Sequence, residues 1–149
     1  MNKRLRRAMV GVLATATAVT SLMVGTVGTA SAADGESFLY RGQTLNAGQM
    51  IHRYTPNGWE IQLVMQTDGN LVEYLAGFSG GGRYVCWASN TNSGSGYHAT
   101  YQHDGNFVVY APSGKAVWAS NTVGGSGQTV DMNNNGVLYV GNKAINGGC

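Results

Sequence analysis

The fold is decided by a ten-residue stretch, MQTDGNLVEY at residues 65–74, which recurs as YQHDGNFVVY at residues 101–110. Each copy leads into the same pentapeptide, WASNT, at residues 87–91 and 118–122. A degenerate third copy, DMNNNGVLY, occupies residues 131–139. Aligned on their polar residues, the copies lie 36 and 29 residues apart. This spacing predicts one supersecondary unit repeated three times.

Each copy has the pattern of β-structure. Apolar and polar residues alternate with period two, and clusters of Gly, Asn and Ser interrupt them, which is typical of short strands. After residue 32 no stretch shows the i, i+3, i+4 apolar spacing of a helix. The sequence therefore predicts an all-β domain. The link from Tyr74 to Trp87 is longer than that from Tyr110 to Trp118, which predicts a longer surface loop.

Five side chains of the first copy occupy alternate positions: Gln66, Asp68, Asn70, Val72 and Tyr74. On one strand they emerge from a single face. Sugar hydroxyls both donate and accept, so they pair with amides and a phenol, and a carboxylate accepts a stronger, charge-assisted bond. The pattern predicts a pyranose-binding face, with the valine against the C–H face of the sugar.

The alternative is an ordinary solvated face, which is the better interpretation of a single such strand. The second copy, however, repeats the same five residue types: Gln102, Asp104, Asn106, Val108 and Tyr110. A solvated face tolerates any polar residue, so identical repetition favours binding. Gly69 and Gly105 also recur, although glycine weakens a strand unless a bend or a close approach requires it.

The third copy, aligned on the same five positions, departs from the pattern at Asp131 and Asn133 and keeps Asn135, Val137 and Tyr139. Asp131 replaces an amide and can only accept, and Asn133 lacks the charge of an aspartate. The segment KAIN at residues 143–146 stands where the tryptophan pentapeptide is expected. We expect a weak or silent third site.

Residues 1–32 have the features of a secretory signal. A basic start with four Lys and Arg residues precedes a long uncharged run that ends in Ala30-Ser31-Ala32. This pattern predicts cleavage after Ala32 and an extracellular domain of residues 33–149 with no membrane span. An uncleaved membrane anchor is the alternative, because the uncharged run is long enough to span a bilayer. The pair Arg6-Arg7 leaves Sec and twin-arginine export open.

Removal of the signal changes the charge. Four of the nine Lys and Arg residues lie in residues 1–32 and none of the seven Asp and Glu residues do, so the remainder carries a formal charge of −2. That balance predicts no nucleic-acid partner, which would need a clustered basic face. His52, His98 and His103 lack metal-ligand spacing, and no P-loop or dinucleotide fingerprint is present. We expect neither catalysis nor a metal or cofactor.

The chain has two cysteines, Cys86 and Cys149. In a secreted protein such a pair predicts one disulfide, which stabilises by closing a long loop. Two free thiols, or an intermolecular bridge through Cys149, are the alternatives.

The motif Q-x-D-x-N-x-V-x-Y followed by W-A-S-N-T resembles the bulb-type mannose-binding lectins, over about residues 37–142. The resemblance suggests a single-domain bacterial member. It implies a β-prism II fold of three four-stranded antiparallel sheets with pseudo-threefold symmetry and one sugar site per sheet. It also implies that Asp68 and Asn70 hold the axial O2 of mannose, Gln66 its O3 and Tyr74 its O4, with the second copy acting alike. Trp87 and Trp118 are expected to fill the core.

The resemblance therefore implies a secreted lectin for mannose or mannose-rich glycans, and a homodimer would double its sites. A bacteriocin-like toxin is the alternative, because some bacterial relatives kill competitors with the same prism. Those toxins usually carry two prisms and an extended C-terminus, so a single prism ending at Cys149 favours the lectin.

Overall fold

The computed structural model describes residues 30–31, 35, 37–77 and 82–149. Most of the expected secretory signal, residues 1–29 and 32, lies outside the described residues. The described part consists of strands and turns without a helix, as expected for an all-β domain. Consequently it contains no helix with the length and apolar character needed to cross a membrane.

Twelve strands form three four-stranded antiparallel sheets, one for each repeat. The first sheet contains β4 (Met50–Tyr54), β5 (Glu60–Met65), β6 (Leu71–Ala76) and β7 (Arg83–Ala88). The second contains β3 (Gln43–Asn46), β8 (His98–Tyr101), β9 (Phe107–Tyr110) and β10 (Ala116–Ala119). The third contains β2 (Phe38–Tyr40), β11 (Thr129–Met132), β12 (Leu138–Val140) and β13 (Lys143–Ala144).

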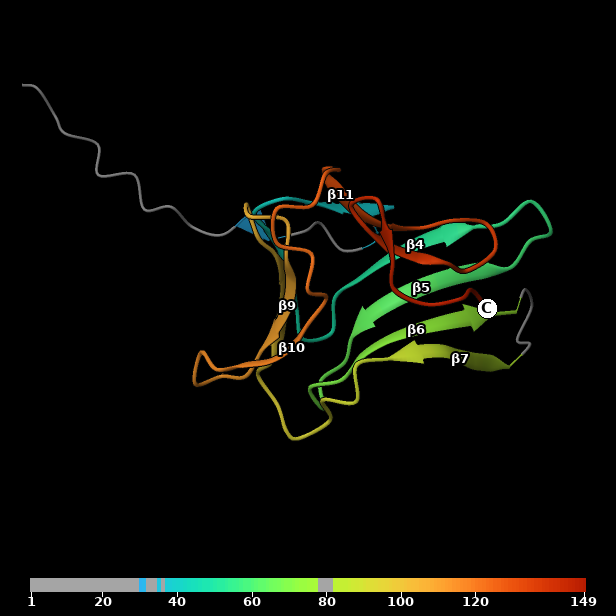
Figure 1. Ribbon diagram of the computed structural model, residues 1–149. Helices are drawn as coiled ribbons and strands as arrows, with labels where there is room; N and C mark the ends of the chain where they lie inside the picture. Colours follow the sequence, from blue (N-terminus) through green and yellow to red (C-terminus); the bar gives the residue numbers. More distant parts are fainter. Residues whose placement is uncertain (1–29, 32–34, 36, 78–81) are drawn as a thin grey trace, which may run out of the picture.

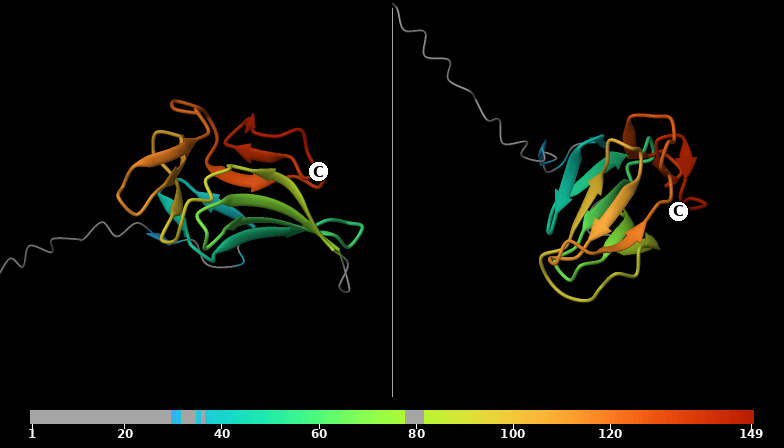
Figure 2. Two further views of the ribbon diagram at one scale, coloured as in Figure 1. Left: turned by 90° about the horizontal axis from the view of Figure 1, so that it is seen from below. Right: turned by 60° about the vertical axis from the view of Figure 1, so that its left-hand side comes forward.

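The N-terminal strands connect the three sheets. β2 pairs with β11 of the third sheet, where Leu39 lies opposite Val130. β3 pairs with β8 of the second sheet, where Leu45 lies opposite Ala99. The chain then enters the first sheet through β4, so its first strands contribute one strand to each sheet. The resulting prism has three sheets around one core (Figures 1 and 2) and confirms the expected fold.

A short additional strand, β1 (Ala30–Ser31), pairs in parallel with β3 at the edge of the second sheet. Cleavage after Ala32, as the sequence predicts, would remove β1 and leave that sheet with its four antiparallel strands.

The core is built from equivalent inward positions of the repeats. Leu71, Phe107 and Leu138 each begin the strand that follows the repeated turn, and all three side chains are fully buried. Trp87 and Trp118 pack against this cluster and meet each other edge to face, with ring centroids 5.1 Å apart. Burial of these apolar and aromatic surfaces is the main stabilising contribution to the prism.

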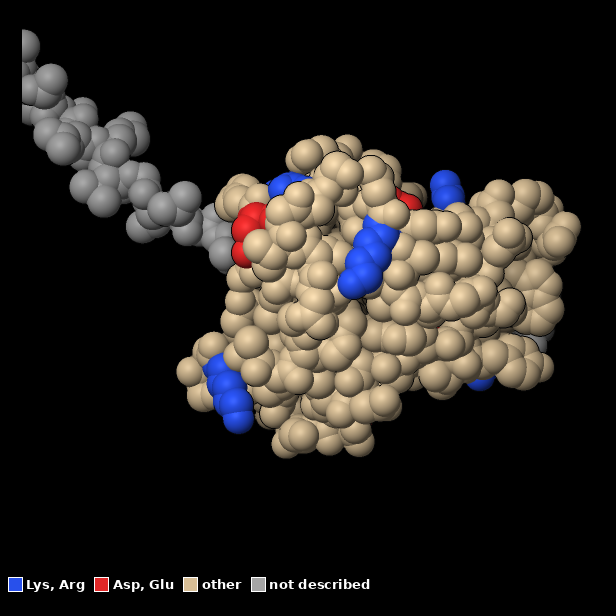
Figure 3. Space-filling view, viewed as in Figure 1, with Lys and Arg blue, Asp and Glu red and all other residues tan. Residues whose placement is uncertain are grey.

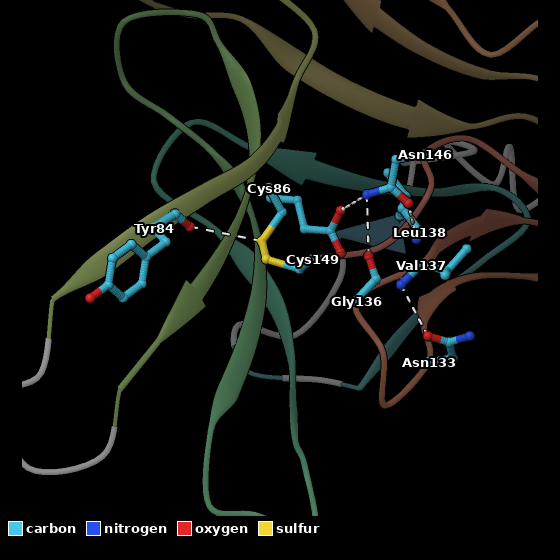
Figure 4. The surroundings of a disulfide bond; sticks show 9 residues. Tyr84, Cys86, Asn133, Gly136, Val137, Leu138, Asn146 and Cys149 are labelled. Carbon is cyan, nitrogen blue, oxygen red and sulfur yellow. Dashed lines mark hydrogen bonds between the residues drawn. A yellow bond between two sulfur atoms is a disulfide. The ribbon is translucent and has the colours of Figure 1, made fainter.

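A disulfide joins Cys86 to Cys149, which confirms the intramolecular pairing (Figure 4). Cys86 lies in β7 of the first sheet, and Cys149 follows β13 of the third. The bond spans 63 residues of sequence, so it fastens the C-terminal segment of the third repeat to the first sheet. Around these sheets, charged side chains are scattered singly over the face seen in Figure 3.

Candidate functional site

The repeated motif forms a tight turn and not the extended strand expected from its alternation. Residues 66–70 connect β5 to β6, with a hydrogen bond from the backbone N–H of Gln66 to the carbonyl oxygen of Asn70 (2.8 Å). Gly69 has a φ of +93°, which a residue with a side chain rarely adopts. Its backbone N–H donates to the carbonyl oxygen of Gln66 (3.2 Å). The prediction of a single strand face is therefore wrong.

The turn is what allows the motif to contact one ligand. On a straight strand Gln66 and Tyr74 would lie eight residues apart, roughly 26 Å, too far to reach a single pyranose. In the folded hairpin the amide Nε2 of Gln66 donates a hydrogen bond to the hydroxyl of Tyr74. The first and last residues of the motif thus meet at one place beside the turn.

The side chain of Asn70 is oriented by the pentapeptide that follows. Its Oδ1 accepts hydrogen bonds from the Ser89 hydroxyl (3.1 Å) and from the Thr91 backbone N–H (3.1 Å). Because only the oxygen can accept both bonds, the amide nitrogen Nδ2 remains available to donate to a ligand. The Ser89 hydroxyl also accepts from the Leu71 backbone N–H (3.0 Å). This role of the pentapeptide was not predicted from the sequence, although its strict repetition was a signal.

Asp68 is exposed and presents the complementary acceptor. Its Oδ1 accepts the backbone N–H of Asn70 (3.0 Å), so the second oxygen, Oδ2, is the one left for a ligand. An NH₂ donor from Asn70 and a carboxylate acceptor from Asp68 are therefore offered side by side. Such a pair matches a single hydroxyl group, which accepts one hydrogen bond and donates another.

The second copy reproduces this geometry. Asn106 Oδ1 accepts from the Ser120 hydroxyl (3.1 Å) and the Thr122 backbone N–H (3.3 Å). Asp104 Oδ1 accepts from the Asn106 backbone N–H (2.9 Å). Gln102 Nε2 donates to the Tyr110 hydroxyl. Two turns on two different sheets thus carry the same arrangement of free donors and acceptors.

The two valines of the motif are placed differently from the expectation. Val72 and Val108 are 2% and 3% exposed, so they offer little apolar surface to a ligand. A surface concavity of about 360 Å³ does lie at the first turn, lined by Gly48, Val64, Gln66, Thr67, Asp68 and Arg83. Val64, which lies opposite Val72 on β5, is the apolar side chain that reaches this concavity.

The tyrosines of the two turns have different neighbours. The Arg83 guanidinium lies over the Tyr74 ring, 4.2 Å from its centroid, and donates to Gln62 Oε1. Arg83 lies in the longer link between Tyr74 and Trp87 of the first repeat. This link therefore lengthens the loop and also brings the Arg83 side chain to the concavity at the first turn. In the second repeat His98 stacks on Tyr110 instead, with centroids 5.5 Å apart. The two sites share their polar groups but differ beside the phenol.

In the structure, the third copy aligns with the first two in a different register from the one that the sequence predicted. The residues before and after the turn pair in every copy: Met65 with Leu71, Tyr101 with Phe107, and Met132 with Leu138. Gly136 has a positive φ like Gly69. These positions place Asn133 at the Gln66 position and Asn135 at the Asp68 position, two residues on from the predicted alignment. Asp131, predicted to replace Gln66, lies before the turn.

This register removes the binding groups of the third turn. Val137 stands at the position of Asn70, and Tyr139 at that of Val72. Asn133 Oδ1 accepts the backbone N–H groups of Asn135 (2.9 Å) and Val137 (3.0 Å), so it stabilises the turn. Gly141 stands at the position of Tyr74 and provides no phenol. The third copy retains the fold of the turn without its donor and acceptor pair.

A buried carboxylic acid lies on the inner face of β6, between the two motif residues Val72 and Tyr74. Glu73 is fully buried, where the second and third copies have Val109 and Val140. Its Oε2 accepts a hydrogen bond from Asn146 Nδ2 (2.5 Å), and its Oε1 has no hydrogen-bond partner among the residues that the structure describes. Burial raises the pKa of Glu73 from 4.5 to about 7, and the bond from Asn146 opposes this rise.

The arrangement is suited to hydrogen bonding with a ligand that both donates and accepts. The free groups at each turn are a carboxylate oxygen, amide groups and a phenol, without a nucleophile held beside a base. Among the described residues, no group of three or more His, Cys, Asp or Glu side chains is arranged to hold a metal ion.

Comparison with known proteins agrees with this geometry. The structure is similar to a lectin from garlic, Allium sativum, with 37% identity and a TM-score of 0.56, covering 70% of this chain and 91% of that one. It is similar to the mannose-specific agglutinin of snowdrop, Galanthus nivalis, in complex with methyl-α-D-mannoside, with 30% identity and a TM-score of 0.57, covering 72% and 91%.

Among curated sequences, the mannose-specific lectin of Narcissus pseudonarcissus is 35% identical over 78 residues, or 52% of this chain and 62% of that protein. The chain thus spans less than two thirds of the length of this relative. No family model matches the chain. The extent of the structural matches nevertheless shows that the chain belongs to the family of bulb-type mannose-specific lectins, which bind carbohydrates and are not enzymes.

Proposed function

We propose that this protein binds mannose-containing glycans at two sites, one at the turn of residues 66–70 and one at the turn of residues 102–106. The observation that carries the proposal is the identical arrangement of donor and acceptor groups on the two turns. In each, the asparagine is held by its oxygen and the aspartate by one of its oxygens. These hydrogen bonds leave the asparagine Nδ2 and the aspartate Oδ2 available to a ligand in both copies.

The axial O2 hydroxyl of mannose fits the paired groups of Asn70 and Asp68. It accepts from the asparagine Nδ2 and donates to the aspartate Oδ2. Gln66 and Tyr74, already hydrogen-bonded to each other, are placed to bind the neighbouring O3 and O4. A sugar with an equatorial O2 would leave this polar pair without a partner, which is the basis of strong discrimination.

Each site is shallow, so one sugar should bind weakly, with a Kd of about 1 mM. Useful affinity then comes from two sites that engage one branched glycan or one glycan-covered surface. We also propose that residues 1–32 direct secretion, which their basic start, uncharged run and terminal Ala30-Ser31-Ala32 support.

A glycan array tests the proposal. The full chain should bind mannose-rich glycans, and free methyl-α-D-mannoside should displace it, whereas the galactose analogue should not. Binding to unrelated glycans that mannoside does not displace would contradict the proposal.

A further inference from the structure

A second kind of concavity lies away from the two motif turns, between the first and third sheets. It has a volume of about 360 Å³, in the range of small-molecule sites. One wall is the β4–β5 turn, which contributes Thr55, Asn57 and Trp59. The other wall comes from the third repeat and contributes Asn134, Asn135 and Cys149. None of these residues belongs to the two proposed mannose sites.

Both walls are held in place. The Thr55 hydroxyl accepts the backbone N–H of Trp59 (3.0 Å), and the Thr55 backbone N–H donates to the Trp59 carbonyl oxygen (2.7 Å). On the other side the Cys149 backbone N–H donates to the Asn135 carbonyl oxygen (2.9 Å), and its disulfide fastens it to β7. Arg53 links the walls through a bond to the Met132 carbonyl oxygen (2.7 Å). The cleft is therefore preformed.

The lining combines an aromatic surface with unused amides. Trp59 is 37% exposed, and Tyr84 lies beside it with ring centroids 6.4 Å apart. Asn57, Asn134 and Asn135 are exposed, and none of their side-chain amides forms a hydrogen bond with another described residue. Each amide offers both a donor and an acceptor. A flat aromatic ring bordered by such groups has the chemistry of a carbohydrate site.

We propose that this cleft is a third carbohydrate site, which binds a glucose-configured pyranose stacked on Trp59. When all ring hydroxyls are equatorial, the axial C–H groups give both faces of the sugar an apolar surface that packs on an indole. The hydroxyls then point outward in the ring plane, toward the amides of Asn57, Asn134 and Asn135. The third repeat, whose turn has lost its mannose-binding groups, thus supplies one wall of a site of different specificity.

Tryptophan fluorescence provides a direct test. Trp87 and Trp118 are packed against the core, so a sugar in the cleft should perturb mainly Trp59. In an Asp68→Asn, Asp104→Asn background, titration with cellotriose should give a saturable change in emission. Trp59→Phe in that background should lose this change, and Asn134→Ala should weaken binding at least threefold. An absent or non-saturable response in the parent would overturn the proposal.

The controls separate this site from the mannose sites. Trp59→Ala in the otherwise native chain should bind methyl-α-D-mannoside with unchanged affinity, which also shows that the variant is folded. Asn134→Ala removes an exposed side chain without an internal partner, so it tests the cleft even if a change at Trp59 disturbs the turn. Cellotriose binding that calorimetric titration finds unweakened in both Trp59→Phe and Asn134→Ala would place the ligand elsewhere. Failure of mannoside binding alone would contradict the proposed function and leave the cleft supported.

Discussion

At the scale of single residues, each proposed site depends on groups of the following pentapeptide that orient its asparagine. Ser89 and Thr91 hold the oxygen of Asn70, and Ser120 and Thr122 do the same for Asn106. A protein side chain that is already oriented for its ligand binds that ligand more tightly, because the side chain loses less conformational freedom on binding. The pentapeptide thus has two roles, since its tryptophan packs against the core while its serine hydroxyl and threonine backbone N–H hold the asparagine oxygen.

Replacement of Ser89 by alanine tests this positioning. The variant loses one donor to Asn70 Oδ1 and one acceptor for the Leu71 backbone N–H. We expect mannoside affinity at the first site to fall by about 1 kcal/mol, roughly fivefold, with no change at the second site. Calorimetric titration measures both sites, and Ser120→Ala is the matched variant with the opposite pattern. A first-site affinity of Ser89→Ala unchanged from that of the native chain would show that the serine does not position the asparagine.

Glu73 gives the fold a pH dependence. Its pKa is raised in the folded state, so the folded chain holds this proton more tightly than the unfolded chain does. The resulting stabilisation is complete below pH 4.5 and is lost as the pH rises to about 7. Glu73→Gln retains an acceptor for Asn146 and removes the titration. The free energy of unfolding of the native chain should therefore fall across this range by roughly 2–3 kcal/mol relative to the variant. Urea denaturation at several pH values measures this difference, and parallel curves for the two proteins would refute it.

At the scale of elements, the two motif turns require glycine. A Cβ on Gly69 would lie 2.8 Å from both the Gly94 carbonyl oxygen and the Tyr97 ring, and φ there is +93°. Gly114 has a similar φ of +79° but no atom within 4 Å of such a Cβ.

We therefore expect Gly114→Ala to cost about 1 kcal/mol from backbone strain alone, and Gly69→Ala to cost at least about 1 kcal/mol more. Thermal unfolding of both variants measures the difference. Equal losses would mean that the crowding at Gly69 is relieved without cost.

The sequence predicted the strands and the two sets of polar residues, because repetition fixes both. It did not predict the turn, because alternating polar residues look alike in a strand and in a tight hairpin, and the recurring glycine was the signal that distinguished them. For the same reason, the predicted alignment of the third copy with the first two was wrong by two residues. The prediction matched polar residues, whereas the features that the three turns share are the positive-φ glycine, here Gly136, and the buried pair that flanks the turn, here Met132 and Leu138.

At the scale of the whole molecule, three sheets share one core and two of them carry the full set of donor and acceptor groups of a proposed site. The N-terminal strands β2 and β3 complete the third and second sheets. The repeats could not predict which sheet each N-terminal strand joins, because that is set by pairing between segments distant in the sequence. This pairing fixes the two proposed sites on two different sheets, so under the proposal a single chain binds two sugars.

The number of mannose sites tests the account most directly. Asp68→Asn keeps the Oδ1 acceptor for the Asn70 backbone N–H but replaces Oδ2 with a donor, and Asp104→Asn does the same in the second copy. Calorimetric titration with methyl-α-D-mannoside should give two sites for the native chain, one for each single variant and none for the double variant. Mannoside binding retained by a folded double variant would contradict the assignment of these two turns as the sites.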